Sequence, residues 1–188
     1  EILRRHQVLR TNFPIRAGKP VAIVRPGGPS GLELIDCSSW DKAEKERFLH
    51  DRIQAEATAP FDLAADALVR VVLLRLDRAD HVLLLTTHHI VSDGWSIGIL
   101  LHEMSDLYRA LDQGTPQLLP EPEIQYADFS RWQHKTIAGE KLERDLAYWR
   151  SVLQGAPDLF TLPADRPRPA FYRYEGAKVP LAVGRQLT

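Results

Sequence analysis

The stretch from residue 67 to residue 96, ALVRVVLLRLDRADHVLLLTTHHIVSDGWS, decides the fold class of this chain. It contains two runs rich in valine and leucine, residues 67–76 and 81–87, which are separated by a polar turn at residues 77–80. Short apolar runs bounded by turn residues are typical of buried strands. The pattern therefore predicts two adjacent strands that form a hairpin at the centre of a sheet.

A helix is predicted directly after this hairpin. Apolar side chains recur there at the spacing of one helix face, at Ile97, Leu100, Leu101, Met104, Leu107, Tyr108 and Leu111. The pattern stops at Gly114 and Pro116, and two further helices are predicted over residues 126–137 and 141–154. The aromatic residues of these last helices are spaced like core residues: Tyr126, Phe129, Trp132 and Trp149. Strands followed by long helices indicate a mixed α/β architecture.

The region before the hairpin predicts shorter elements. Apolar residues at helical spacing indicate a helix over residues 2–13, and strands are expected near residues 21–25 and 32–35. Ser38, with Asp41 three positions further on, resembles the start of another helix. These elements add to both layers of an α/β fold.

Composition excludes several functional classes. The chain has 188 residues, enough for one domain with a sizeable core. Its 24 basic and 25 acidic residues are mixed along the sequence, so no charged surface for nucleic acid or anionic lipid is expected. No apolar run approaches the roughly 20 residues that span a bilayer. The single cysteine, Cys37, forms no internal disulfide and is interpreted as a buried, inert thiol in a cytoplasmic protein.

The residues that point to chemistry follow the second strand, in the segment His88–Ser96. Neighbouring residues of a strand point to opposite faces, so a reactive His89 implies that His88 packs inside. Imidazole titrates near neutral pH and can accept a proton from an attacking amine, as acyl transfer requires. By themselves, two histidines beside a strand are more often packing residues than catalytic ones, and further ligands for a metal are not evident nearby.

Two residues after the histidines are candidates for supporting roles. Asp93 precedes a helix, where its carboxylate either caps free N–H groups or pairs with an arginine. Gly94 allows close approach of a ligand, and N–H groups at a helix start can polarise a carbonyl. Further along the same helix, His102 and Glu103 are interpreted as solvent-exposed.

Three separated segments, read together, resemble the condensation domains of nonribosomal peptide synthetases. Residues 88–96, HHIVSDGWS, match the HHxxxDG motif of that family. Residues 5–13, RHQVLRTNF, resemble its RHExLRTxF motif with Gln7 in place of glutamate, and residues 126–132, YADFSRW, are similar to YxDFAxW. The sequence of residues 148–169 also resembles the one usual in that family. HHxxxDG alone is shared with other chloramphenicol-acetyltransferase-like proteins, so the flanking motifs carry the assignment.

The resemblance implies a chloramphenicol-acetyltransferase-like α/β two-layer sandwich that forms the N-terminal half of a V-shaped condensation domain with two subdomains. Residues 1–170 are expected to form the N-terminal subdomain without its opening strand. The proline-rich segment 157–169 is interpreted as a crossover or linker that leads to a strand near residues 178–183. Residues 171–188 are expected to form the crossover or the start of the second subdomain. The reacting groups meet between the subdomains, so the chain alone is expected to be inactive.

The resemblance also implies roles for residues and partners. His89 takes the catalytic role, as a base or by orienting the acceptor amine, and Gly94 borders the donor carbonyl. Structural roles fall to His88, Asp93, Arg5 and Arg10, with Asp93 paired with an arginine such as Arg10 or one in the other subdomain. No metal or bound cofactor is implied. Substrates arrive on the phosphopantetheine arms of donor and acceptor peptidyl carrier domains, beside an adenylation domain.

The implied activity is amide bond formation between a carrier-bound acyl or peptidyl thioester and a carrier-bound aminoacyl amine. The segment 92–96 resembles the type that joins an L-configured donor, whereas heterocyclising domains carry aspartate in place of the first histidine. Epimerisation or ester formation by a related HHxxxDG enzyme remains an alternative. A catalytically silent module that recruits a partner is another, although such modules tend to lose the histidine or aspartate.

Overall fold

A computed structural model describes residues 1–27, 32–115, 119–157 and 179–182, together with Pro163 and Phe171. The chain divides into two compact units, Glu1–Lys141 and Leu142–Thr188, and each is described by itself. The predicted boundary after residue 170 falls beside residues outside the described ranges and stays a prediction. Of the strand expected at residues 178–183, the described residues 179–182 have no regular secondary structure.

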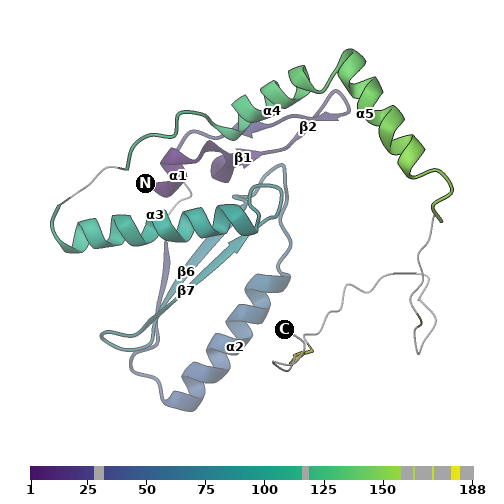
Figure 1. The fold of residues 1–188 in the computed structure, drawn as a ribbon. Helices are drawn as coiled ribbons and strands as arrows, with labels where there is room; N and C mark the ends of the chain where they lie inside the picture. The colour runs from purple at the N-terminus through teal and green to yellow at the C-terminus, as the bar shows by residue number, and fades with distance from the viewer. Residues whose placement is uncertain (28–31, 116–118, 158–162, 164–170, 172–178, 183–188) are drawn as a thin grey trace. The chain divides into compact units, whose positions relative to one another are not determined.

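A three-stranded sheet organises the first unit (Figure 1). Its strand order is β5 (Glu33–Asp36), β6 (Val69–Arg75) and β7 (His81–Thr87). Strands β5 and β6 run parallel, whereas β6 and β7 are antiparallel, with Val72 opposite Leu84. The predicted hairpin is therefore confirmed, and β6 lies at its expected place in the centre. Among the described residues, however, β7 pairs only with β6 and forms an edge.

One face of the sheet packs against α2 (Lys42–Thr58), the helix that connects the parallel strands β5 and β6. Val72 and Leu74 of β6 point to this face because side chains alternate along a strand. They are buried with Cys37 against partly buried residues of the helix and its approach, among them Trp40, Phe48 and Leu49. The helix begins with a capping box between Asp41 and Glu44, so Asp41 is the N-cap, and the start predicted at Ser38 is three residues early.

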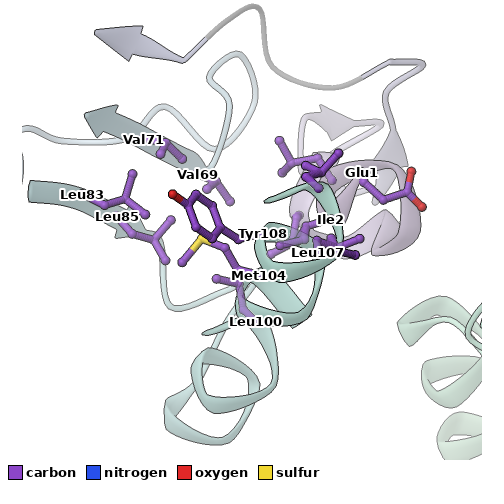
Figure 2. A pocket seen from close by; sticks show the side chains of 14 residues that line it. Glu1, Ile2, Val69, Val71, Leu83, Leu85, Leu100, Met104, Leu107 and Tyr108 are labelled. Carbon is purple, nitrogen blue, oxygen red and sulfur yellow. The ribbon is translucent and has the colours of Figure 1, made fainter. Parts of the chain in front are cut away.

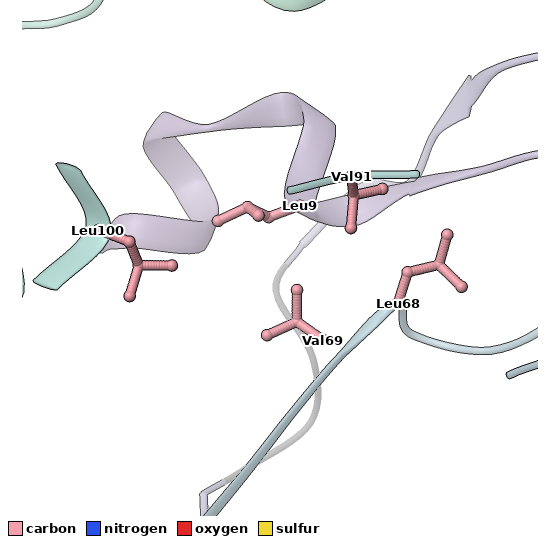
Figure 3. Packing of buried hydrophobic residues seen from close by; sticks show 5 residues of the cluster. All are labelled: Leu9, Leu68, Val69, Val91 and Leu100. Carbon is pink, nitrogen blue, oxygen red and sulfur yellow. The ribbon is translucent and has the colours of Figure 1, made fainter. Parts of the chain in front are cut away.

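The opposite face packs against α3 (Gly94–Asp112), the helix predicted after the hairpin. The cluster on this side joins residues that are far apart in sequence, as Figure 3 shows: Leu9, Leu68, Val69, Val91 and Leu100. All five side chains are less than 10% exposed, which makes this cluster the support for the turn that enters α3. None of the described helices is long and apolar enough to cross a membrane.

An apolar pocket of about 510 Å³ lies farther along the same face (Figure 2). Val69, Val71, Leu83 and Leu85 of the hairpin line it from one side. Residues of α3 and the N-terminal segment line the other side, including Met104, Leu107 and Ile2. No residue of the turn from His88 to Asp93 contributes to its lining. This apolar pocket is therefore separate from the predicted reactive group.

The N-terminal segment departs from the single helix predicted over residues 2–13. It forms a short helix α1 (Ile2–Arg5), a 3-10 turn η1 (Gln7–Arg10) and strand β1 (Thr11–Asn12). The helix stops because His6 is extended, with φ −97° and ψ 95°. Two small antiparallel pairs follow, β1 with β4 (Ile23–Val24) and β2 (Ile15–Arg16) with β3 (Lys19–Pro20).

The later helices are α4 (Tyr126–Thr136) and α5 (Gly139–Val152), close to the predicted bounds. Their aromatic residues were predicted to be core, and in this chain that prediction is wrong. Tyr126 is 61% exposed, Trp132 58% and Trp149 55%. The three-residue spacing of Tyr126, Phe129 and Trp132 places them in contact along α4, with ring centroids 5.7–5.9 Å apart, but no described residue buries that face.

Candidate active site

The residues predicted to carry chemistry lie in a turn between β7 and α3. The His88 N–H donates a hydrogen bond to Leu68 O at 3.0 Å, which extends the pairing of the hairpin beyond the strands. The Val91 N–H donates to His88 O at 3.1 Å and closes the turn. Val91 is only 4% exposed and packs in the core, whereas His89 and Ile90 are exposed. The turn is thus anchored at both ends and presents its middle to solvent.

The two histidines have different surroundings. His88 is half-buried, and its ring meets Phe61 edge to face with centroids 5.8 Å apart. Its Nδ1 accepts a hydrogen bond from the Ile90 N–H at 3.0 Å. The exposed His89 ring is open to a substrate, as a group that accepts a proton has to be. Catalysis by His89 and support by His88 stay predictions, and this geometry favours them.

Asp93 caps the helix that follows the turn. Its Oδ1 accepts the Ser96 N–H at 2.8 Å, and its own N–H donates to Ser96 Oγ at 2.6 Å. Hydrogen bonds from the Ser96 amide and hydroxyl hold the pKa of the Asp93 carboxyl below its ordinary value, and nearby His89 adds a smaller effect in the same direction. Of the two roles predicted for Asp93, the structure shows the helix cap.

The start of α3, directly after the Asp93 cap, has free space beside its backbone. Gly94 is the first residue of α3, and a Cβ atom added to it would meet nothing within 4 Å. On the inner side, a small pocket of about 90 Å³ is lined by residues of the turn, of α3 and of the N-terminal segment, including Ser92, Ser96 and Val8. Ser92 Oγ lies 2.6 Å from Thr87 Oγ1, which ties the turn back to β7.

Arg5 ties the N-terminal segment to α3. Its side chain is 5% exposed and forms an ion pair with Glu103 at 2.9 Å. The guanidinium also donates to the carbonyls of Leu119 at 3.1 Å and Pro120 at 2.7 Å, and His6 Nε2 lies 2.7 Å from Glu103. The prediction that Glu103 is solvent-exposed is wrong, because its side chain is only 13% exposed. Glu103 lies three residues after the buried Leu100, and residues three apart share one face of a helix, so its position already indicated burial.

Arg10 does not pair with Asp93. Its guanidinium donates instead to Leu3 O at 3.2 Å and to Arg25 O at 2.6 Å. It therefore joins α1 to the end of β4, a structural role in a different place from the one expected. The Asp93 carboxylate accepts hydrogen bonds from the Ser96 amide and hydroxyl instead.

Replacing Glu103 by glutamine is expected to lower the free energy of unfolding by about 3–5 kcal/mol, because a buried arginine then loses its counter-charge. Burial acts to raise the pKa of Glu103, but hydrogen bonds from Arg5 and His6 outweigh it and hold that pKa below the ordinary value of 4.5. The stabilisation is therefore full above pH 4.5 and is lost as the pH falls through the lowered pKa.

Urea unfolding of both proteins between pH 3 and pH 7 measures this difference. The matched control is Asp106→Asn, which removes the half-buried partner of the exposed His102 and Arg109 on the same helix and is expected to cost less than about 1 kcal/mol. Equal losses for the two variants would contradict the role of Glu103.

Other candidate centres are weaker in the described part of the chain. No three His, Cys, Asp or Glu side chains gather there as metal ligands. Cys37 is completely buried, and burial, with a smaller contribution from Asp36, raises the pKa of its thiol. A thiol with a raised pKa is a poor nucleophile, as its interpretation as an inert residue requires.

Comparisons with known proteins agree with the predicted family. The Condensation domain family matches residues 1–188. Chondramide synthase cmdD of Chondromyces crocatus is 43% identical over 188 residues, 100% of this chain and 5% of that protein. Phosphinothricin tripeptide synthetase PhsC of Streptomyces viridochromogenes is 39% identical over 187 residues, 100% of this chain and 17% of that protein. The chain thus spans a small part of the curated relatives that it matches.

Solved structures share the fold. The X-domain from teicoplanin biosynthesis, in its complex with OxyB, is 28% identical with a TM-score of 0.76, over 90% of this chain and 36% of that one. The epimerization domain from the third module of tyrocidine synthetase B is 26% identical with a TM-score of 0.71, over 89% of this chain and 37% of that one. The predicted α/β condensation-domain fold is confirmed, and this chain belongs to the condensation domain family of peptide synthetases.

Proposed function

We propose that this chain is the N-terminal half of a condensation domain that forms amide bonds between carrier-bound substrates. The observation that carries the proposal is the exposed imidazole of His89, presented by a turn that the core, the hairpin and a capped helix hold at both ends. Catalytic groups are commonly placed on such loops of a rigid frame. The family supplies the reaction, and the position of His89 supports its part in it.

In the proposed reaction, the amine of the acceptor attacks the carbonyl carbon of the donor thioester. A C–N bond forms, the C–S bond breaks, and the amine proton ends on the leaving thiol. His89 contributes as a base or by holding the amine in line, and both roles need a neutral ring nitrogen within hydrogen-bond distance of the amine. Gly94 leaves the donor side uncrowded, and the Asp93 cap fixes the helix start beside it.

The remaining participants are part of the proposal as well. The chain spans 36–37% of two solved chains that share its fold, so the other wall of the site is expected from the second subdomain. Phosphopantetheine arms of donor and acceptor carrier domains deliver the substrates, and an adenylation domain loads the acceptor. We propose no bound metal or cofactor, and a cytoplasmic location follows from that assembly.

Products distinguish this proposal from the related activities. A complete domain given one carrier loaded with an L-aminoacyl group and a second loaded with an acceptor is expected to place a dipeptide on the second carrier, with the donor still L-configured. Mass spectrometry of the carriers and chiral analysis of the hydrolysed product measure both properties.

Two results would contradict the assignment. A D-configured residue made by the domain would favour epimerisation, the activity named for one structure of the same fold. No transfer for any matched pair of carriers, together with tight binding of another protein, would favour a recruitment module. The X-domain bound to OxyB has a fold similar to this chain.

A further inference from the structure

Behind the candidate site, an aromatic ring lies between the supporting histidine and an arginine. The Phe61 ring meets the His88 ring edge to face, at 5.8 Å between centroids and 88° between planes. The guanidinium carbon of Arg70 lies 3.8 Å from the centroid of the same Phe61 ring. Contacts of both kinds are attractive and depend on orientation. Phe61 is therefore held from two sides, and one of them is His88.

Arg70 is itself fixed by four acceptors around the C-terminal end of α2. Its guanidinium donates to the Glu56 carboxylate at 3.0 Å and to the carbonyls of Glu56 at 3.0 Å, Ala59 at 2.9 Å and Pro60 at 3.3 Å. Arg70 lies on the central strand β6, opposite Thr86 of β7. The arginine thus binds the segment that carries Phe61 to the part of the sheet next to the histidine turn.

His88 transmits this support to the turn through its backbone and its ring. The backbone N–H binds Leu68 O and the carbonyl accepts the Val91 N–H. The ring Nδ1 accepts the Ile90 N–H at 3.0 Å, which requires the neutral tautomer with its proton on Nε2. If the His88 ring rotates, the Ile90 N–H loses its acceptor. That amide belongs to the residue immediately after His89, so the His88 ring supplies one of the hydrogen bonds that hold the turn around His89.

We propose that Phe61 and Arg70 are positioning residues for the reaction, which hold the ring of His88 and through it the turn that carries His89. The proposal rests on the proposed amide-forming function for its kinetic test. Neither residue touches the exposed His89 ring, so their effect is on alignment. Displacing a catalytic group by about 1 Å can reduce a rate about 100-fold.

The kinetic test uses a complete domain with two loaded carrier proteins. Phe61→Leu keeps an apolar side chain without the ring, and Arg70→Met keeps the apolar stem without the guanidinium. Both are expected to lower kcat about 10–100-fold, with KM for either carrier changed by less than about twofold, since the substrate contacts are intact. Phe61→Tyr keeps the ring edge and is expected to restore most of the activity.

Two controls separate positioning from general destabilisation. Arg75→Met changes the other arginine of β6, which pairs with Asp36 at the far end of the strand, and kcat is expected to stay unchanged. Arg52→Met removes another partner of Glu56 but leaves Arg70 and Phe61 in contact, and it is also expected to keep kcat. Thermal unfolding of every variant shows that the compared proteins are folded at the assay temperature.

A spectroscopic measurement tests the mechanism without turnover. The ¹⁵N NMR signals of the His88 ring and of the Ile90 amide should report an unprotonated Nδ1 that accepts a hydrogen bond in the unaltered protein and in Arg75→Met. In Phe61→Leu and Arg70→Met, this signature is expected to weaken.

These experiments distinguish failure of the positioning role from failure of the proposed amide-forming function. If the unaltered domain transfers acyl groups and depends on His89, then unchanged kcat in folded Phe61→Leu and Arg70→Met overturns the positioning role. The positioning role is also overturned if these variants change KM and leave kcat unchanged, or if Phe61→Tyr loses as much activity as Phe61→Leu. If the unaltered domain transfers nothing, the proposed function fails. The NMR signature then decides the positioning role, since retention of the signature in both variants would refute it.

Discussion

In a complete domain, replacing His89 by alanine is expected to reduce amide formation by about 10²–10⁴-fold, the contribution typical of a positioned acid–base group. The fold should remain intact, because His89 is exposed and the turn is held by the backbone of His88 and by the buried Val91. Dipeptide on the acceptor carrier is measured by mass spectrometry over the first turnovers.

His102 provides a matched control for this substitution. It is another exposed histidine, on the surface of α3, where its ring pairs with Asp106 at 3.3 Å. His102→Ala is expected to transfer at the unaltered rate. Undiminished product from His89→Ala would remove His89 from the mechanism, and a loss shared equally by both variants would point to destabilisation instead.

The isolated 188-residue chain is expected to show no measurable transfer, although it contains His89. Alignment of two reactants in a closed site can supply about 7–11 kcal/mol of the barrier, equivalent to at least about 10⁵-fold in rate. This chain covers 36% of a solved chain with the same fold, so most of the surface that aligns the substrates is expected elsewhere. The assay compares the isolated chain with a complete domain under the same carriers.

The same chain is expected to associate in solution. Strand β7 has a free edge among the described residues, and such edges can pair with another chain. Tyr126 and Trp132 on α4 add exposed aromatic surface. Light scattering after size-exclusion chromatography should show species larger than the monomer.

In the transfer assay of the isolated chain, a rate near that of the complete domain would mean that the second subdomain is dispensable and that the proposed site is wrong.

Local patterns were sufficient for the main elements of this fold. The two apolar runs on either side of a polar turn predicted β6 and β7, because such runs are typical of strands buried on both faces. The stripe from Ile97 to Leu111 predicted α3, because its spacing matches one face of a helix. The position of His88 and His89 at the strand–helix junction followed from the same reading. The same patterns predicted that Asp93 either caps the helix or pairs with an arginine, and the structure shows the cap.

Local patterns failed where a distant contact overrides them. The helical spacing from Ile2 to Phe13 predicts one helix, yet the chain is extended at His6, whose ring binds Glu103 on α3. The aromatic spacing on α4 marks an apolar face but says nothing about its partner. That face is exposed among the residues that the structure describes.

The sequence by itself determined the family, the α/β class and the residue expected to react, because motifs and periods are properties of consecutive residues. Only the tertiary structure decided which groups support that residue. Arg5 meets Glu103 across 98 positions, and Arg70 reaches Glu56 beside the Phe61 ring that braces His88. Such pairs form because the sheet and its two helices bring distant segments within hydrogen-bond distance, and spacing along one chain does not encode which partners meet.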